Sequence, residues 1–478
     1  MDRLDSLRTR LHCVGQAHLL EGVEALPPGD VESLCRRIES IKWETLPELI
    51  DQYVKNRPAG ATGEIVPASC VTVDPECVCD AVSLVDAEGL REQGETLLKE
   101  GRVAAFTVAG GQGTRLGWQG PKGTFPASPV TGKPLFRLFA EQILAAQQRW
   151  GHTIRWYIMT SEANDTQTRS FFLDNRCFGL DRRQIMMFPQ GMMPAFDSAS
   201  GRVLLEGPGR LAMSPDGHGG SYRALLRSGA LDQMEGRGVE AISYFQVDNP
   251  LVPVLDPVFL GLHIDPDLSS GEFTSKMVPK CGPDEKVGVF ALRGGVPGVV
   301  EYSDLSREQA GAVDASGRLC FAAGNVAMHI ISTDFARRVA IEGEDPLPWH
   351  RADKKVTWHD PASGETHVPA EPNAVKLERF VFDAMGIAAK PAILEVCRET
   401  EFAPIKNASG VDSAGSSIQL QSDLYGGWLE QAGVSVPRRD DGHVDAAIEI
   451  SPLTAMSAEM LSARGLPAGI SPGSVFAC

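Results

Sequence analysis

The sequence has no long apolar run. None of its stretches approaches the ~18 consecutive apolar residues of a membrane-spanning helix. Its first residues, MDRLDSLRTRLHCV, mix charges throughout and have no apolar segment typical of a secretion signal. We therefore expect a cytoplasmic protein that has no membrane partner.

Paired cysteines and an excess of basic residues are also missing. The ten cysteines are scattered, and the closest two, Cys77 and Cys79, lack the C-x-x-C spacing of zinc and redox motifs. We expect reduced thiols. Lys and Arg number 45 against 62 Asp and Glu, and this net charge of −17 argues against nucleic acid as a partner. Any phosphate site in so acidic a chain must concentrate its few basic residues, so their positions are informative.

A glycine-rich loop is the most informative feature that is present. The apolar run 103–108 (VAAFTV) predicts a buried strand, and residues 109–117 that follow read AGGQGTRLG. Glycines at the carboxyl end of a strand can aim successive N–H groups at an anion. Arg115 and Lys122 add positive charge to these donors. The pattern predicts a phosphate or nucleotide loop, and a simple turn is the alternative.

Neither of the two commonest nucleotide motifs fits this region. The G-x-G-x-x-G fingerprint requires a glycine where Leu116 stands. The P-loop motif fails at Gly132-Lys133, because Ala127 and Pro134 occupy positions that require Gly and Ser or Thr. A different kind of nucleotide site is therefore expected.

The chain divides into three regions by pattern. Residues 1–95 predict a helical N-terminal region of structural role, with an extended connection at 65–82. From 96 to 385 strand and helix signals alternate, which predicts an α/β domain with a mostly parallel central sheet, closed by a helix over 377–384. Residues 386–478 are rich in Pro, Gly and Ser, and we expect a small C-terminal lobe there.

Three predicted strands end in residues suited to a ligand. Gly110, Gln190 and Asp248 each lie just past such an end. Ligands of open α/β sheets bind beyond the carboxyl ends of the strands, so we expect these residues to converge on one cleft. Asp248 and the adjacent Asn249 suit Mg²⁺ (or Mn²⁺), which prefers carboxylate oxygens together with substrate phosphates. A helix cap or Asx turn is the alternative for this pair.

Seven short segments stand in order along the chain: GGQGTRLG with PKG (110–123), FPQGMMP (188–194), SPDGHGG (214–220), EYS (301–303), GN (324–325), PNAVKLE (372–378) and EFAPIKN (401–407). In this order they resemble the motifs of the eukaryotic-type UDP-N-acetylglucosamine pyrophosphorylases. Each motif is weak alone, but their shared order is specific. The first hundred residues and the tail carry far less of the resemblance. Two positions depart from the family pattern. His218 stands where the family has Asn, and the residues after the GN segment differ from the usual pattern at Met328.

The resemblance implies a Rossmann-like GT-A nucleotidyltransferase domain and a role for each matching residue. UTP would be bound by Ala109, Gly110, Gly111, Gln190, Gly217 and Lys376. The sugar would be bound by His218, Glu301, Tyr302 and Asn325. Arg115, Lys122 and Lys406 would be catalytic, and Asp248 would hold the metal. Taken alone, Lys376 or Lys406 is typical of a solvated surface charge.

The implied reaction joins UTP and N-acetylglucosamine 1-phosphate to form UDP-N-acetylglucosamine and pyrophosphate. The sugar phosphate attacks the α-phosphate in line, assisted by a metal, and needs no general base because it is already ionised. A UDP-glucose or broad UDP-sugar pyrophosphorylase is the alternative, favoured by His218. An inactive nucleotide-binding regulatory protein is an alternative of another class, opposed by the presence of Arg115, Lys122 and Asp248. The sequence does not indicate an oligomeric state.

Overall fold

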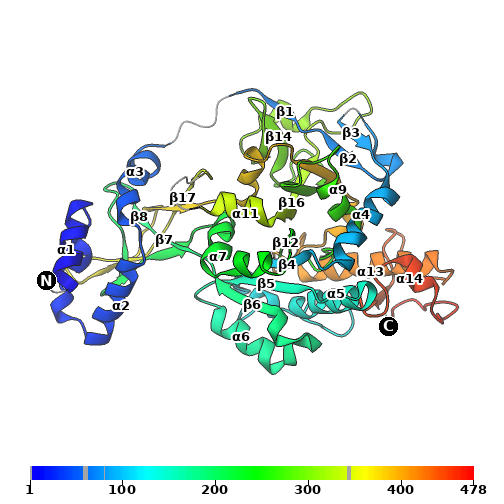
Figure 1. Cartoon of the computed structure of the whole chain (residues 1–478), viewed down its shortest axis with the longest axis horizontal. Helices are drawn as coiled ribbons and strands as arrows, with labels where there is room; N and C mark the ends of the chain where they lie inside the picture. The colour runs from blue at the N-terminus through cyan, green and yellow to red at the C-terminus, as the bar shows by residue number, and fades with distance from the viewer. Residues whose placement is uncertain (1–2, 58–62, 80, 342–345) are drawn as a thin grey trace. The chain divides into compact units, whose positions relative to one another are not determined.

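The predicted central sheet is present in the computed structural model, which describes residues 3–57, 63–79, 81–341 and 346–478 (Figure 1). It has twelve strands. Its main path runs, in spatial order, through β3 (Val82–Leu84), β2 (Cys70–Thr72), β21 (Ala392–Glu395), β13 (Phe273–Pro279), β16 (Ala323–Ser332), β12 (Ala241–Gln246), β4 (Val103–Val108), β5 (Arg155–Thr160) and β6 (Ile185–Pro189). Along this path only β16 runs antiparallel to its neighbours. The sheet is therefore mostly parallel, as predicted.

Contacts within the chain separate two units. Unit 1 comprises Met1–Thr62, Gln190–Ser221 and Pro346–Asp383. Unit 2 comprises Gly63–Pro189, Tyr222–Asp345 and Ala384–Cys478, and it contains the large sheet. Each unit has a hydrophobic core of its own.

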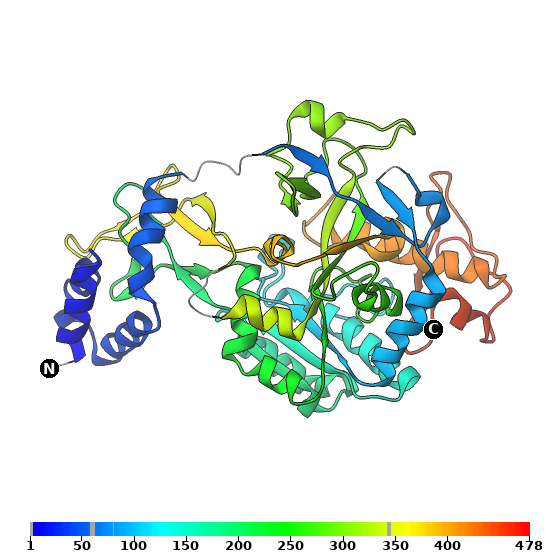
Figure 2. The same ribbon diagram turned by 45° about the horizontal axis from the view of Figure 1, so that its top comes forward.

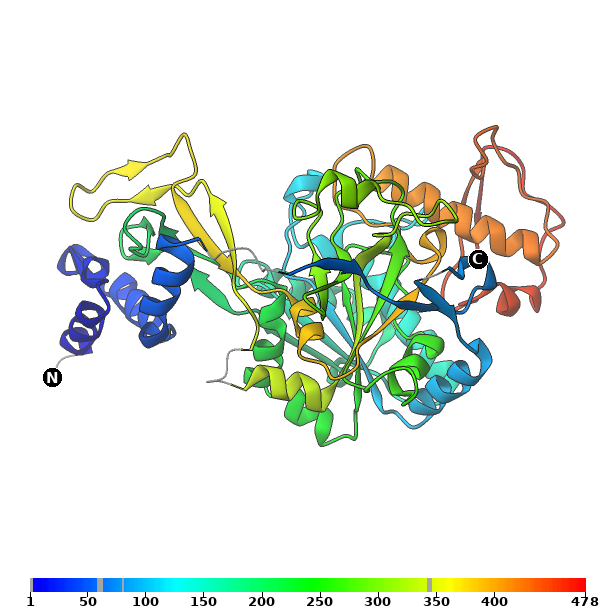
Figure 3. The same cartoon turned by 90° about the horizontal axis from the view of Figure 1, so that it is seen from above.

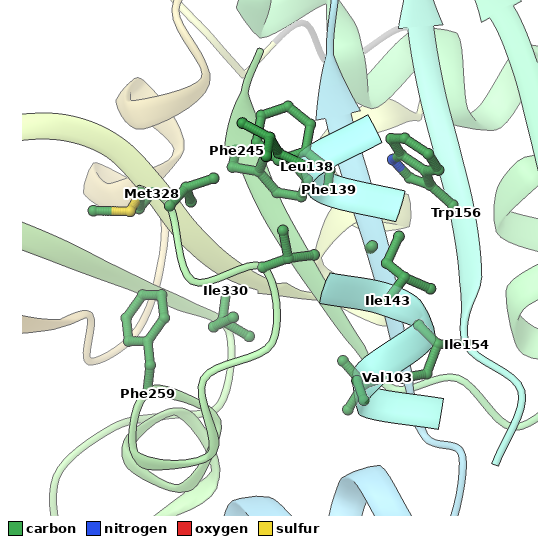
Figure 4. Close-up of a cluster of buried hydrophobic side chains, with 14 of the residues drawn as sticks. Val103, Leu138, Phe139, Ile143, Ile154, Trp156, Phe245, Phe259, Met328 and Ile330 are labelled. Carbon is green, nitrogen blue, oxygen red and sulfur yellow. The ribbon is translucent and has the colours of Figure 1, made fainter. Parts of the chain in front are cut away.

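The main core of unit 2 lies between the sheet and helices α4 (Ala87–Lys99), α5 (Leu135–Trp150) and α9 (Pro257–Ile264). Val103 and Trp156 point from their strands toward Ile143 of α5, and all three side chains are buried (Figure 4). The amphipathic spacing of α5 and the apolar strands form this layer because burial of apolar surface is the main driving force of folding. Helix α8 (Ala230–Glu235) covers the other face, where the hydroxyl of Tyr157 donates to Gln233 at 2.9 Å.

The C-terminal part of unit 2 folds around helix α13 (Ala414–Gln431), drawn in orange in Figure 3, with strands β22 (Ala446–Glu449) and β23 (Ser474–Ala477). The carboxylate of Glu449 accepts the N–H groups of Val130 and Thr131 at 3.0 and 2.8 Å. These bonds attach the segment to the loop before α5. No helix in the described ranges is long and apolar enough to cross a membrane.

Unit 1 combines the N-terminal helices with short strands. Helices α1 (Arg3–Cys13) and α2 (Pro28–Glu39) share a buried cluster with strand β20 (Ala374–Glu378). Strand β20 lies between β17 (His350–Lys354) and β8 (Phe196–Asp197). Strand β7 (Met192–Pro194) pairs antiparallel with β11 (Met213–Pro215), which contains the first two residues of the glycine-rich SPDGHGG segment.

Two sequence-based expectations for local structure are wrong. Residues 377–384 are not one helix: Leu377 belongs to β20, and a 3-10 helix, η11 (Val381–Gly386), follows. Val375 and Leu377 are both fully buried, with Lys376 between them only partly buried, and this alternation is that of a strand. The stretch 65–82 contributes β1 (Ile65–Pro67) and β2 to the large sheet, so it is more than an extended connection.

The three-region division at 95 and 385 stays a prediction of domain boundaries. The contact units cut the chain at other positions, because 190–221 and 346–383 group with the N-terminal helices. Within the predicted regions, residues 1–2, 58–62, 80 and 342–345 lie outside the described part of the chain.

Candidate active site

The glycine-rich loop begins where β4 ends. The buried Ala109 donates its N–H to the carbonyl of Met159 at 2.8 Å. The buried side chain of Asn164 donates its amide to the carbonyls of Ala109 and Gly111, at 2.9 and 3.3 Å. With these carbonyls held inward, the N–H groups of Gly110 and Gly111 donate to no protein acceptor in the described part of the chain. Such unused donors suit an anionic ligand.

Asn164 therefore supports the loop, although the sequence analysis did not include it in the site. Its signal in the sequence is its position shortly after the predicted strand that follows the loop, with the polar run Ser161–Glu162 before it. A second bond fixes its orientation: its Oδ1 accepts the N–H of Ser161 at 2.8 Å. Both ends of the amide are thus committed to the backbone.

Two basic residues of the loop region differ in exposure and in ion pairing. Arg115, in the 3-10 helix η6 (Thr114–Leu116), is exposed and forms no ion pair within the described residues. The Nζ of Lys122 lies 3.1 Å from Oδ2 of Asp248, and both side chains are largely buried. The fold thus brings together two predicted site residues that are 126 positions apart.

Asp248 is positioned by the strand register. Strand β12 runs parallel to β4 with Gln246 opposite Val108, and the N–H of Val247 donates to the carbonyl of Val108 at 3.2 Å. Asp248 is therefore next to the start of the glycine loop. The convergence of Gly110, Gln190 and Asp248 on one cleft stays a prediction.

Asn249 is not available to a metal, which corrects its interpretation as part of the metal pair. Its Nδ2 donates to the carbonyl of Glu401 at 2.6 Å, and its Oδ1 accepts the N–H groups of Ala403 and Leu251 at 3.0 and 3.2 Å. The amide is a structural link to residues 401–403.

Lys406 belongs to the segment that this link holds. The N–H of Ile405 donates to the carbonyl of Asp248 at 2.9 Å, so the residue before Lys406 is bonded directly to the end of β12. The Lys406 side chain is exposed, and its Nζ lies 5.3 Å from the centre of the Phe402 ring. Within the described residues its ammonium group forms no ion pair.

A metal at this position would have Asp248 as its protein carboxylate. No group of three or more His, Cys, Asp or Glu residues within the described ranges could hold a metal by itself. One oxygen of Asp248 contacts Lys122, and no hydrogen bond within those ranges uses the other. A single accessible carboxylate fits Mg²⁺, which often takes its remaining ligands from water and substrate phosphates. One carboxylate does not fit an ion that takes all its ligands from protein side chains.

The predicted sugar-binding residues of unit 2 gather near Gly288. Asn325, in β16, donates its N–H to the carbonyl of Gly288 at 2.9 Å. A Cβ at Gly288 would lie 3.4 Å from Oε1 of Glu301, so Glu301 also borders this glycine. Tyr302, next in the chain, is 44% exposed.

The amide of Asn325 is partly committed. Its Oδ1 accepts the N–H of Ala327, whose φ of 55° is unusual for a residue with a side chain. Within the described residues the NH₂ group of Asn325 donates to no acceptor, so this part of the amide remains for a ligand. Met328, where the sequence departs from the family pattern, is buried in the core, so its departure affects packing.

Unit 1 contains the second glycine-rich loop. Gly217 has φ of +84°, and a Cβ there would lie 2.3 Å from the carbonyl oxygen of Arg379. The N–H of Gly219 donates to that oxygen at 2.8 Å, and the N–H of Arg379 donates to the carbonyl of Asp216 at 2.9 Å. Only glycine fits position 217 because both the torsion and the close approach exclude a side chain.

His218 is held in one tautomer. Its Nδ1 accepts the N–H of Val381 at 3.0 Å, so the proton of the neutral ring is on Nε2. The ring stacks on Phe380 with centroids 5.2 Å apart and an interplanar angle of 18°. Burial, with a smaller contribution from the nearby His350, lowers the pKa of His218 to about 4. The imidazole is therefore neutral at physiological pH and is only a donor toward a ligand.

The other two predicted residues of unit 1 lie on neighbouring parts of its fold. Gln190 comes just before β7, and the following Gly191 accepts the N–H of Asp216 at 3.1 Å. Lys376 is on the face of β20 opposite the buried Val375, and it forms no ion pair among the residues that the structure describes. Their roles as UTP ligands stay predictions.

A mostly parallel α/β sheet with a glycine-rich loop, an acidic strand end and basic residues beside it defines the class of α/β nucleotidyltransferases. The chain belongs to the UTP–glucose-1-phosphate uridylyltransferase family, whose model matches residues 45–439. It is thus a UTP:sugar-1-phosphate uridylyltransferase, a UDP-sugar pyrophosphorylase.

Individual relatives agree with this placement. The chain is 36% identical to human UDP-N-acetylhexosamine pyrophosphorylase-like protein 1, over 95% of this chain and 93% of that protein. It is also 36% identical to Arabidopsis thaliana UDP-N-acetylglucosamine diphosphorylase 1, over 96% of this chain and 90% of that protein. The crystal structure of the Trypanosoma brucei UDP-N-acetylglucosamine pyrophosphorylase is similar with a TM-score of 0.78 and 26% identity, covering 100% of this chain and 98% of that chain. The expected fold is confirmed.

Proposed function

We propose that this enzyme makes UDP-N-acetylglucosamine and pyrophosphate from UTP and N-acetylglucosamine 1-phosphate. An oxygen of the sugar phosphate forms a bond to the α-phosphorus of UTP while the bond from that phosphorus to the bridging oxygen of the β-phosphate breaks. Pyrophosphate leaves with the bond electrons. The observation that carries the proposal is the approach of Lys122, Asp248 and the Lys406 segment to the end of β4, beside the unused N–H groups of the glycine loop.

The proposed roles follow from the charge and freedom of each side chain. Arg115, exposed and unpaired within the described residues, suits the leaving pyrophosphate, which its guanidinium can contact through two bonds. Lys122 suits the α-phosphate and Lys406 the attacking phosphate. Because the reacting groups are anions that need no deprotonation, positioning and charge stabilisation supply the catalysis.

UTP and sugar contacts are proposed for the remaining residues. Ala109, Gly110 and Gly111 would bind the nucleotide through the backbone, with Gln190, Gly217 and Lys376 also assigned to UTP. Glu301, Tyr302 and Asn325 would bind the sugar with His218. The sequence resemblance supports these assignments.

We propose that Asp248 holds Mg²⁺ or Mn²⁺ with substrate phosphates, and that the bound ion would neutralise charge on the phosphates. Activity should disappear in EDTA and return with either ion. Asp248→Asn should be nearly inactive, whereas Asp304→Asn, a change at an exposed carboxylate, should keep wild-type turnover. Full activity in EDTA would remove the metal from the proposal.

His218 is the residue on which sugar choice should depend. The acetamide of N-acetylglucosamine has one acceptor and one donor, and an Asn side chain can pair with both. His218 uses its acceptor nitrogen on Val381, so only its Nε2–H remains, which can donate equally to the acetamide carbonyl or to a 2-hydroxyl. We therefore expect weakened discrimination against glucose 1-phosphate.

The test is kcat/KM for both sugar phosphates in the wild type and in His218→Asn. The variant should favour N-acetylglucosamine 1-phosphate by a further ~10–100-fold, the effect of one mismatched buried polar group. His350→Asn, which changes the other histidine stacked on Phe380, is the matched control and should leave the preference unchanged. A wild-type enzyme that uses glucose 1-phosphate and ignores N-acetylglucosamine 1-phosphate would favour the UDP-glucose alternative.

A further inference from the structure

Unit 2 contains a largely buried ion triad whose two carboxylates belong to the same chain segments as the predicted site residues Asp248 and Lys406. Lys276, in β13, is 1% exposed, and its Nζ lies 2.5 Å from Oδ2 of Asp256 and 2.7 Å from Oε2 of Glu401. The ammonium also lies 5.2 Å from the centre of the Phe259 ring. No role in the reaction proposed above uses these three residues.

The triad is costly to bury, so its members depend on one another. An isolated charge in the protein interior is strongly unfavourable unless it is paired. Burial opposes the charged form of Lys276, but the two carboxylates outweigh it and raise the pKa of Lys276. The ammonium in turn outweighs burial at Asp256, whose pKa is lowered, while burial dominates at Glu401, whose pKa is raised. Removing Lys276 would leave two largely buried carboxylates without a cation.

Both carboxylates belong to segments that carry site residues. Asp256 ends the loop that starts at Asp248, and its Oδ1 caps helix α9 by accepting the N–H of Val258 at 2.9 Å. Glu401 starts the segment that ends at Lys406, and its carbonyl accepts the amide of Asn249. Lys276 in β13 thus binds the last residue of the segment 248–256 and the first residue of the segment 401–406.

The hydrogen bonds between the two segments complete the connection. Ala403 and Ile405 donate their N–H groups to Oδ1 of Asn249 and to the carbonyl of Asp248, at 3.0 and 2.9 Å. The hydroxyl of Ser417 in α13 donates to the carbonyl of Ala403 at 2.6 Å. From the triad to Lys406, the segment is therefore anchored at Glu401, Ala403 and Ile405, and its position relative to Asp248 is determined.

We propose that Lys276 is a positioning residue: it acts through Asp256 and Glu401 to hold Lys406 at a defined place relative to Asp248. This inference rests on the proposed function, in which Lys406 binds the attacking sugar phosphate. Because a displacement of about 1 Å can cost ~10²-fold in rate, loosening the anchor should affect the use of the sugar phosphate. Binding of UTP, which depends on the glycine loop, should be spared.

The experiment compares Lys276→Met and Glu401→Ala, which remove the anchor, with Glu401→Gln, which keeps its shape and can still accept from Lys276. The two disruptive variants should lose ~10–100-fold in kcat/KM for the sugar 1-phosphate while KM for UTP changes by less than about twofold. Glu401→Gln should recover most of the loss. If Lys276→Met does not fold, the comparison of Glu401→Ala with Glu401→Gln tests the positioning role, because Glu401 is more exposed than Lys276.

Glu395→Ala is the matched control. Glu395 forms another buried ion pair of the same sheet, with Arg318, and no role in the reaction is proposed for it. Its loss should lower stability without changing either kinetic constant. The positioning role is overturned if Lys276→Met and Glu401→Ala keep wild-type kcat/KM for the sugar phosphate, or if they raise KM for UTP equally. A failure of the proposed function is distinguishable, because the wild type would then release no pyrophosphate from UTP and N-acetylglucosamine 1-phosphate.

Discussion

The basic residues of the predicted site differ in burial and in ion pairing. Lys122 is held by Asp248 in a largely buried ion pair. Arg115 and Lys406 are exposed and form no ion pair within the described ranges. A free guanidinium keeps all its donors for a ligand, whereas the paired lysine is already oriented toward the strand end.

Replacing Arg115 by Ala should reduce kcat by ~10²–10³-fold, the usual effect of losing one charge-stabilising group. The fold should persist, because the loop is held through Ala109, Gly111 and Asn164. Steady-state kinetics and the thermal midpoint measure the two effects. Arg182→Ala removes another exposed arginine and should change neither. Near wild-type turnover in the Arg115 variant would show that this residue does not contact the leaving pyrophosphate.

His218 should make stability depend on pH in acid. Its folded pKa of about 4 lies below the ordinary value of 6.5, so between these values the unfolded chain binds a proton that the folded chain does not. The free energy of unfolding should therefore fall as the pH drops from 6.5 toward 4, with a slope of up to ~1.4 kcal/mol per pH unit from this group. Above pH 6.5 it should contribute no slope.

Urea unfolding of wild type and His218→Asn at several pH values measures this contribution. The variant should lose less stability in acid than the wild type. His263, whose pKa burial lowers to about 3, remains in both proteins and supplies a common background. Parallel stability curves for the two proteins would contradict the assigned burial of the His218 ring.

At the scale of elements, helices α4 and α9 lie side by side in unit 2 (Figure 2). Glycines make their close packing possible. A Cβ at Gly94 of α4 would lie 1.8 Å from the carbonyl oxygen of Pro257, and one at Gly261 of α9 would lie 1.9 Å from that of Leu90. The contacts are with backbone, so a small side-chain shift cannot relieve them. Helix α9 is the helix that Asp256 caps, which connects this packing to the ion triad.

Gly261→Ala should therefore destabilise the protein by ~1–3 kcal/mol, the usual cost of overpacking, or more because backbone must move. Gly427→Ala is the control, since Gly427 lies in helix α13 and a Cβ there would meet nothing within 4 Å. That change should stabilise the protein by ~0.5–1 kcal/mol, because Ala loses less conformational freedom in a helix. Thermal or urea denaturation measures both. Equal effects would mean that the helices are not in close contact.

At the scale of the whole molecule, two units with separate cores predict unfolding in more than one step. Calorimetry should show two transitions. Leu377→Ala in the core of unit 1 and Leu262→Ala in the core of unit 2 should each lower a different transition, by ~2–5 kcal/mol of unfolding free energy. A single transition, lowered by both variants and with equal calorimetric and van't Hoff enthalpies, would show that the units unfold together.

The sequence alone determined the local features of this protein. The apolar run of β4, the glycines after it and the acidic end of β12 could be predicted, because strand periodicity and glycine torsions are properties of a few neighbouring residues. Alternation of strands and helices predicted the parallel sheet for the same reason. The roles proposed for Arg115, Lys406 and the sugar-binding residues rest on motif order and stay predictions.

Tertiary structure decided what depends on residues far apart in the chain. The contact of Lys122 with Asp248, the commitment of Asn249 to residues 401–403 and the buried triad of Lys276 each join segments that no local pattern connects. The tautomer of His218 is likewise set by Val381, 163 residues away. A hydrogen bond or ion pair has a partner only once the chain has folded, so the available donors and acceptors of each side chain are known only from the structure.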